Sequence, residues 1–273
     1  RKIYDAFNGR NDENSVWIRD GLCRLVANVL FVEDSRWPNM FHPRVQAYNA
    51  LVFEALTSEE RQAFMTIYND YFYERHNEMW GALAYRKLSM VLERTNMLVT
   101  AEDLGVLPDC VQPTLDALRI LTLEVQTLPK QHGLEFAHLE ANPYLSVATI
   151  STHDMPPMRL WWQERPEAAQ HYYRDRMQKE GRPPVALTTT LAEEIVSRHL
   201  YSPSMLCLLS LQDWLAVDAE MRNPDPRSER INIPGDCYNR WSYRMHVNIE
   251  QLIADEQLNK KLRTIVERSK RNV

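Results

Sequence analysis

The sequence predicts an α/β fold of the parallel β/α-barrel type, preceded by a largely helical N-terminal segment. Two observations support this prediction. Short apolar runs alternate with segments of helical periodicity in the second part of the chain, which is the order that a parallel sheet requires. Each run also ends in polar or acidic side chains, and a (β/α)8 barrel carries its catalytic groups at the carboxyl ends of its strands.

Residues 1–96 are predicted to form a helical subdomain. Apolar and aromatic residues recur there at three- and four-residue steps, the spacing of one helix face. The segment 34–44 contains two prolines and is expected to be an ordered surface loop. Thr57 followed by Glu60 predicts a capped helix start. The aromatic stripe over 64–73 is expected to be a buried helix face.

The second part of the chain contains four predicted strands. They are residues 97–101, 120–125, 146–151 and 205–211. Helices are predicted at 111–119, 166–179, 191–201 and, as one long amphipathic helix, 247–271. The polar side chains at the strand ends are Glu102 and Asp103, Glu124 and Gln126, His153 and Asp154, and Gln212 and Asp213. Acids that cap helices would produce part of the same pattern.

Composition excludes several classes of protein. The net charge of −5, without a dense Lys/Arg run before the C-terminal tail, gives no electrostatic footprint for nucleic acid. No apolar stretch approaches the roughly 20 residues of a transmembrane helix, so no membrane partner is expected. The four cysteines lack metal-ligand spacing, which makes a zinc site or a disulfide framework improbable and favours a reducing, cytoplasmic location.

The acids at the strand ends suggest glycoside chemistry. Such chemistry needs a proton donor at the leaving oxygen and a carboxylate that stabilises or attacks the cationic anomeric carbon. Glu102 and Asp154, from different strands, could supply both groups. The competing interpretation of each residue is structural, with Glu102 capping the helix that follows and His153 and Asp154 forming a capping pair.

Three motifs, in the right order, resemble those of the 4-α-glucanotransferases, the amylomaltase or disproportionating-enzyme family. They are Ala101-Glu102-Asp103-Leu104-Gly105 for that family's strand five, Thr152-His153-Asp154 for strand seven, and Asn232-Ile233-Pro234-Gly235 with Trp241 and Arg244 for its C-terminal signature. Gln212-Asp213 falls where the family has a similar pair. The helical part is similar to the insertion-bearing subtype that acts on maltose and larger glucans.

The resemblance implies a role for each candidate residue. Glu102 would be the general acid/base, and Asp154 would distort the donor sugar and stabilise the oxocarbenium-like state. His153 would hydrogen-bond sugar hydroxyls. Asp103 is balanced between substrate contact and support of its neighbours, and Asn232 between sugar binding and ordering of the turn at Pro234-Gly235. No metal or organic cofactor is implied, because acid catalysis by carboxylates needs neither.

The family's aspartate nucleophile, which lies in an Arg-x-Asp motif on strand four, has no counterpart here. Arg19-Asp20 has the two residues side by side in a segment of helical spacing. The resemblance therefore implies that strands one to four lie before Arg1 and that 97–273 is the C-terminal half of a (β/α)8 barrel. The expected partners are an α-1,4-glucan or maltooligosaccharide and the missing N-terminal half. Without that half, and hence without the nucleophile, the chain should be inactive.

Two alternatives to a transferase stay open. A related α-glucan hydrolase would use the same donor chemistry, and a non-catalytic helical module that binds glycan or protein would use its acids as caps. A truncated barrel should also expose apolar surface and a strand edge, so the chain is expected to form a homo-oligomer or to pair with its missing half. Most of four tryptophans are expected in the core or an interface: Trp161, Trp162, Trp214 and Trp241.

Overall fold

The computed structural model describes residues 2–105 and 107–271 and divides into two compact units. Unit 1 comprises Arg1–Lys87 and Pro108–Cys110, and unit 2 comprises Leu88–Leu107 and Val111–Val273. The division falls within helix α5 (His76–Leu92). Assignment of 1–96 to an insertion and 97–273 to a barrel stays a prediction.

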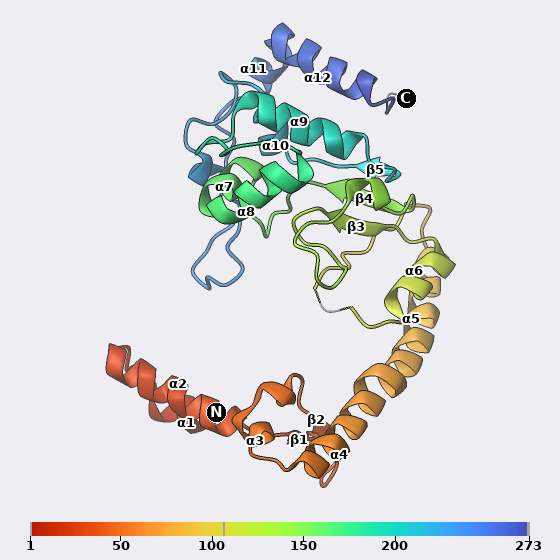
Figure 1. The fold of residues 1–273 in the computed structure, drawn as a ribbon, viewed down its shortest axis with the longest axis vertical. Coiled ribbons are helices and arrows are strands. Elements are labelled where there is room, and N and C mark those ends of the chain that lie inside the picture. Colours follow the sequence, from red (N-terminus) through yellow and green to blue (C-terminus); the bar gives the residue numbers. More distant parts are fainter. Residues whose placement is uncertain (1, 106, 272–273) are drawn as a thin grey trace. The chain divides into compact units, whose positions relative to one another are not determined.

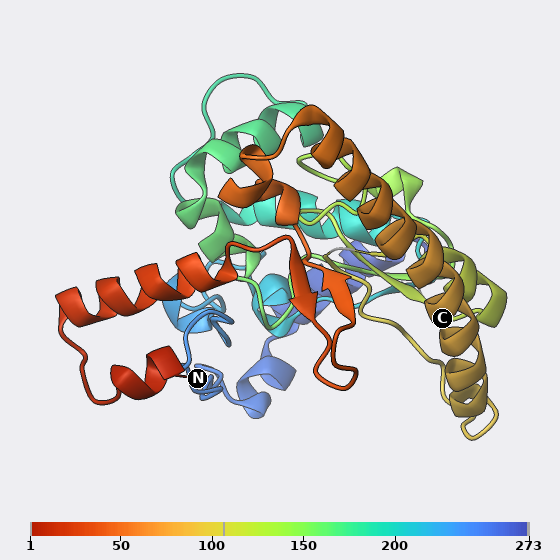
Figure 2. The same cartoon turned by 90° about the horizontal axis from the view of Figure 1, so that it is seen from below.

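Unit 1 is helical apart from one small hairpin. Its elements are α1 (Lys2–Ala6), α2 (Glu13–Ala27), β1 (Phe31–Glu33), β2 (Phe41–Pro43), η1 (Ala47–Asn49), α3 (Leu51–Glu54), α4 (Ser58–Asn69), η2 (Asp70–Arg75, π-helical) and α5. Figure 2 shows the hairpin and the run of helix from α4 through η2 into α5. The predicted cap of α4 is confirmed, because Thr57 and Glu60 form a reciprocal capping box.

The hairpin corrects one prediction. The segment 34–44 was expected to be a loop, but β2 within it pairs antiparallel with β1, with Phe31 opposite Pro43. The Asp34 carboxylate closes the connection by accepting hydrogen bonds from the backbone N–H groups of Arg36 (2.7 Å) and Trp37 (3.1 Å). Strands of three residues fall below the length at which alternation is visible in a sequence.

Unit 2 is built around a parallel sheet in the order β3-β4-β5. Its strands are β3 (Thr122–Val125), β4 (Ser146–Thr149) and β5 (Leu206–Cys207). Thr100 adds a parallel bridge to Leu121, ahead of β3. The four predicted strand segments therefore lie side by side in chain order. They are shorter than predicted, and 97–101 forms only this bridge, because the apolar runs continue beyond the residues that pair.

The helices of unit 2 alternate with these strands in part. They are α6 (Val111–Leu118), η3 (Leu139–Ala141), α7 (Met158–Glu164), α8 (Pro166–His171), η4 (Tyr172–Arg176, π-helical), α9 (Thr189–Leu200), α10 (Leu211–Leu215), η5 (Pro226–Glu229), α11 (Ile249–Ala254) and α12 (Glu256–Arg268). Figure 1 shows α7 to α10 beside the sheet and α12 against α9. Between β3 and β4 there is only the short η3, so the alternation is incomplete.

The predicted C-terminal helix is broken into two. Asp255 separates α11 from α12 and caps α12 by accepting a hydrogen bond from the Leu258 N–H (2.8 Å). Beyond α12, the Arg271 guanidinium donates to four backbone carbonyls in the turn between α9 and β5, those of Leu200, Ser202, Ser204 and Met205. Arg271 therefore stabilises a turn that lies about 70 residues earlier in the chain.

The two cores differ in extent. In unit 1 the buried cluster is Ala47, Phe64 and Tyr68, so the aromatic stripe is buried at two of its positions. In unit 2 the cluster joins α7, α8, α9, α10 and α12, with Trp162, Leu258 and Val196 almost inaccessible. Within the described residues, no helix combines the length and apolarity needed to cross a bilayer.

Candidate active site at the strand ends

Glu102 follows directly on the residues that pair with Leu121, just ahead of β3. Ala101 donates its N–H to the Leu121 carbonyl (2.8 Å), and Leu121 donates to Val99 (3.1 Å). Glu102 then lines a cavity of about 260 Å³ together with His153 and residues from β3 and β4. Its side chain is exposed, and no residue in 2–105 or 107–271 makes a polar contact with it. The carboxylate is therefore free to meet a ligand in this cavity.

Asp103 lies in the opposite environment from its neighbour. It is 4% exposed, and its carboxylate accepts hydrogen bonds from the Leu123 N–H and from Lys130 Nζ, both at 2.7 Å. Lys130 also donates to Glu124 at the end of β3 (2.7 Å). Because both oxygens of Asp103 contact protein, its position ties the 100–105 segment to β3. Lys130 was not foreseen from the sequence, where one lysine in a polar loop carries no signal.

His153 and Asp154 stand on the loop that follows β4, whose four residues are all buried. His153 Nε2 lies 3.4 Å from Asp154 Oδ2. Asp154 Oδ1 accepts a hydrogen bond from the Asn232 side-chain amide at 2.5 Å, across 78 residues of sequence. The two motifs that were singled out separately in the sequence thus meet in one contact.

The Asn232 side chain contacts both Asp154 and a residue beyond the turn at Pro234-Gly235. The turn at Pro234-Gly235 is closed by the backbone, with Asp236 N–H donating to the Ile233 carbonyl (2.9 Å). The Asn232 side-chain oxygen accepts from the Asn239 amide (2.7 Å), so Asn232 links Asp154 to the segment that follows. Both roles considered for Asn232, sugar binding and ordering of the turn, therefore stay predictions.

Trp241 completes the cluster. Its ring lies 4.8 Å from that of His153 at an interplanar angle of 44°, and its side chain is 61% exposed. The expectation for the four tryptophans is confirmed for three of them, since Trp162 is buried and Trp161 and Trp214 pack partly buried against the core. The fourth, Trp241, is exposed and offers an aromatic surface next to His153.

Asp154 borders a second cavity. This cavity, of about 480 Å³, is also lined by Trp161, Glu164 and Arg230. Glu102 and His153 share the first cavity, and Asp154 stands in the wall of the second. His153 therefore lies between the two acids in this arrangement: it lines the first cavity with Glu102, and its ring contacts Asp154. Among the described residues, no group of three or more His, Cys, Asp or Glu side chains has the arrangement of a metal site.

Buried charges lie behind the loop. Asp213 is 1% exposed, and burial raises the pKa of its carboxyl above the usual range. Burial also raises the pKa of Glu229, to about 7, against the opposing effect of the Arg159 guanidinium. The Arg159–Glu229 pair was missed in the sequence, because an acid within Arg227-Ser228-Glu229-Arg230 has the pattern of a solvated loop.

Comparison with known proteins assigns the chain to a family. Residues 17–250 match the family model described as 4-alpha-glucanotransferase. The 4-alpha-glucanotransferase DPE2 of rice is 29% identical over 268 residues, which is 96% of this chain and 28% of the rice protein. The 4-alpha-glucanotransferase of Chlamydia muridarum is 32% identical over 182 residues, which is 65% of this chain and 34% of that protein.

A solved structure shares the fold. The amylomaltase from Streptococcus agalactiae, determined in complex with acarbose, aligns over 70% of this chain and 35% of its own, with a TM-score of 0.50 and 17% identity. The chain thus spans about a third of the length of the relatives that it matches. Because the family model covers most of the sequence, the chain belongs to the 4-alpha-glucanotransferase family.

Proposed function

We propose that this chain is the acid/base-bearing part of a 4-α-glucanotransferase. The complete enzyme would transfer α-1,4-glucan segments between maltooligosaccharides or glycogen- and starch-type glucans by a retaining double displacement. The observation that carries this proposal is the cavity shared by Glu102 and His153 at the carboxyl ends of parallel strands, in a chain of this family.

Glu102 is the proposed general acid/base. In the first step it protonates the departing glycosidic oxygen, and in the second it removes the proton from the acceptor's hydroxyl group. Its exposure and its lack of polar partners within residues 2–105 and 107–271 leave both carboxylate oxygens available for these transfers. A cap or a buried structural acid would instead be occupied, as Asp103 is.

Asp154 is the proposed stabiliser of the oxocarbenium-like state. The hydrogen bond from Asn232 fixes one of its oxygens, and the other faces His153. A carboxylate held in this way presents charge without having to reorganise as the sugar becomes cationic. His153 would hydrogen-bond sugar hydroxyls, and Asn232 would act on the substrate through Asp154. Asp103, with both oxygens engaged by protein, is proposed as support and not as a substrate contact.

A third acid is needed and is proposed to lie upstream. Retention requires a nucleophile about 5 Å from the acid/base, and we assign none within this chain. The sheet of unit 2 would then be the C-terminal part of a (β/α)8 barrel, completed by strands that precede residue 1. The coverage of about a third of each relative is consistent with this division. We also propose a cytoplasmic location.

The test uses maltotriose with this chain alone and with the upstream part of the complete protein. Glucose and longer oligosaccharides should appear only in the mixture. Glu102→Gln should abolish both products, while Glu180→Gln, at an exposed loop position, should leave them unchanged. Glucose and maltose without longer products would indicate the hydrolase, and saccharide binding without turnover in the mixture would indicate the binding module. Activity from the chain alone would contradict an upstream nucleophile.

Self-association is proposed for the chain without its upstream part. Large apolar side chains are exposed in both units, including Trp17, Leu25 and Leu51 in unit 1 and Met97 and Leu208 in unit 2. Surfaces of this kind favour association. Sedimentation equilibrium should show dimers or larger species that dissociate when the upstream part is added. A single monomeric species at high protein concentration would contradict the proposal.

A further inference from the structure

The pair Gln212-Asp213 has no part in the proposed chemistry, yet it is among the most buried polar groups of unit 2. Gln212 is 5% exposed and Asp213 is 1% exposed, and both stand in the first turn of α10. Neither residue lines the cavity that contains Glu102. Burying a carboxylate is costly unless it is well hydrogen-bonded, so the contacts of this pair indicate what it does.

The Asp213 carboxylate joins the two ends of one loop. Oδ2 accepts a hydrogen bond from Ser151 Oγ (2.5 Å), and Oδ1 accepts from the Met158 N–H (2.9 Å). Ser210 Oγ, at the N-cap of α10, also donates to Oδ2 (2.8 Å). Ser151 and Met158 are where the loop carrying His153 and Asp154 begins and ends. One buried side chain therefore fixes the span of that loop.

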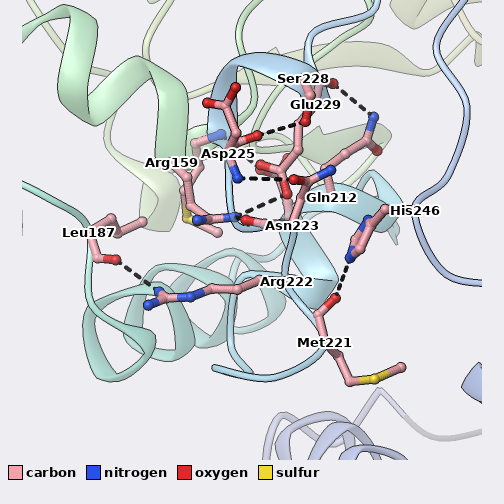
Figure 3. Close-up of polar contacts among 12 residues, drawn as sticks. Arg159, Leu187, Gln212, Met221, Arg222, Asn223, Asp225, Ser228, Glu229 and His246 are labelled. Carbon is pink, nitrogen blue, oxygen red and sulfur yellow. Dashed lines mark hydrogen bonds and ion pairs between the residues drawn. The ribbon is translucent and has the colours of Figure 1, made fainter.

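Gln212 fixes the facing segment. Its side-chain amide donates to the Glu229 backbone carbonyl (3.2 Å), and Glu229 lies three residues before Asn232. The Glu229 carboxylate pairs with Arg159 (3.1 Å), which also donates to the Asn223 carbonyl (2.7 Å). Figure 3 shows this group of contacts, with Arg159 and Glu229 facing one another. Arg159 directly follows Met158, so this route returns to the same loop.

We propose that Gln212 and Asp213 are positioning residues for the candidate active site. Asp213 holds the Asp154 loop and Gln212 holds the Asn232 segment, so the contact between Asp154 and Asn232 is set by adjacent residues of one helix. The proposal deepens the proposed function and rests on it for the importance of Asp154. Misplacement of a catalytic group by about 1 Å can cost about a hundredfold in rate, which gives such an anchor a purpose beyond stability.

The test reads the geometry of the loop without using activity. The His153 Cε1–H signal in the histidine-labelled chain should experience the ring current of Trp241, because the centroids of the two rings are 4.8 Å apart. The signal is assigned by its disappearance in His153→Gln. Its chemical shift without the indole ring current is measured in Trp241→Leu. Asp213→Ala should move the signal at least half of the way to the Trp241→Leu value. Gln212→Ala, which removes one contact, should move it less and in the same direction.

Two variants separate positioning from stability. Asp213→Asn should leave the His153 signal close to its original position. The amide oxygen can accept from the Met158 N–H, and the amide N–H groups can donate to the Ser151 and Ser210 hydroxyls once these rotate. Ser204→Ala is the matched control. It removes two buried hydrogen bonds, to Asn142 (3.0 Å) and Ser146 (2.8 Å), at the opposite end of β4. It should lower the unfolding midpoint and leave the His153 signal in place.

The proposal would be overturned by an unchanged His153 signal in a folded Asp213→Ala variant, or by an equal movement in Ser204→Ala. If Asp213→Ala does not fold, the comparison of Gln212→Ala with Ser204→Ala decides in the same way. Because no saccharide is present, a failure here is distinct from a failure of the transfer reaction. If the unsubstituted chain mixed with its upstream part does not turn over maltotriose, while the His153 signal responds to the variants as expected, the result counts against the proposed function alone.

Discussion

Unit 1 and unit 2 belong to one chain but are held together differently. The principal buried cluster of unit 1 has three residues, whereas that of unit 2 has eighteen, counted over the described residues. Helix α2 buries no side chain, and α9 buries six. Because burial of apolar surface is the dominant favourable term in folding, unit 2 has the larger apolar core with which to hold a site rigid.

The polar contacts show the same contrast. In unit 1 the longest polar chain, Tyr71 to His42 (2.6 Å) and His42 to Asp34 (2.5 Å), is partly exposed. In unit 2 the pair of Arg159 and Glu229 is buried, at 8% and 1% side-chain exposure. Electrostatic contacts are stronger away from water. The candidate site thus lies in the unit whose polar groups are least able to rearrange.

Hydrogen exchange should give the largest difference between the units. We expect amides of α2 to exchange at least about a thousandfold faster than those of α9, because local opening of α2 exposes almost no apolar surface. Exchange followed by mass spectrometry on peptides of the two helices provides the measurement. Equal protection would mean that α2 is covered in solution, by a second copy or by another surface.

Breaking one ion pair should destabilise unit 2 more than unit 1, because the pair in unit 2 is buried and the pair in unit 1 is exposed. Above pH 7, where Glu229 is ionised, Arg159→Met should lower the free energy of unfolding by about 3–5 kcal/mol, because it leaves the Glu229 carboxylate buried without its partner. The matched change in unit 1 is Arg75→Met, which breaks an exposed pair with Asp70 and should cost less than about 1 kcal/mol. Urea denaturation measures both. Similar costs would contradict the contrast in polar burial.

The pH dependence of stability should sharpen the contrast further. Glu229 has its pKa raised from 4.5 to about 7, so the folded state favours the protonated form. Its contribution is fully present below pH 4.5 and is lost as the pH rises through about 7, by an amount on the order of 3 kcal/mol. Glutamine does not titrate, so Glu229→Gln should make the free energy of unfolding of unit 2 depend less on pH between about 4.5 and 7.

The smallest effect should be equal in the two units. Thr57→Ala removes the cap of α4 in unit 1, and Thr188→Ala removes the cap of α9 in unit 2. Each should lower the free energy of unfolding by about 1 kcal/mol, since a capping hydrogen bond is local. Thermal melts of both variants test this. A much larger loss for one of them would mean that helix ends, and not cores, distinguish the units.

Local signals explain which elements the sequence could predict. The start of α4 at Thr57 and the body of α9 follow from side chains within one turn of each other. The break at Asp255 also had a local signal, because an aspartate can cap a helix by accepting from the N–H three residues later, as Asp255 does from Leu258. The apolar periodicity nevertheless continues across Asp255, and it predicted one helix. The hairpin of β1 and β2 is local, but its strands of three residues are too short to show alternation in the sequence. The exact ends of β3, β4 and β5 depend on pairing between segments far apart in the chain, which one sequence does not display.

The site was predictable to the extent that its motifs are contiguous. Glu102 and His153 were singled out separately, and the structure brings them to one cavity. The hydrogen bond of Asn232 to Asp154 and the place of Trp241 beside His153 join segments about 80 residues apart, so spacing alone could not reveal them. Asp103 next to Glu102 shows the limit of a motif: adjacent acids can have opposite environments.

Arg271 bears on how the chain matures during synthesis. Its guanidinium supplies donors to carbonyls of Leu200, Ser202 and Ser204, at separations of 67 to 71 residues. On a ribosome, the turn before β5 is synthesised about 70 residues before these donors, and its carbonyls remain hydrated until Arg271 has been added and has left the exit tunnel. Unit 2 therefore cannot acquire its final form by vectorial, segment-by-segment folding, and an interrupted translation product would retain an open turn next to the third strand of its sheet.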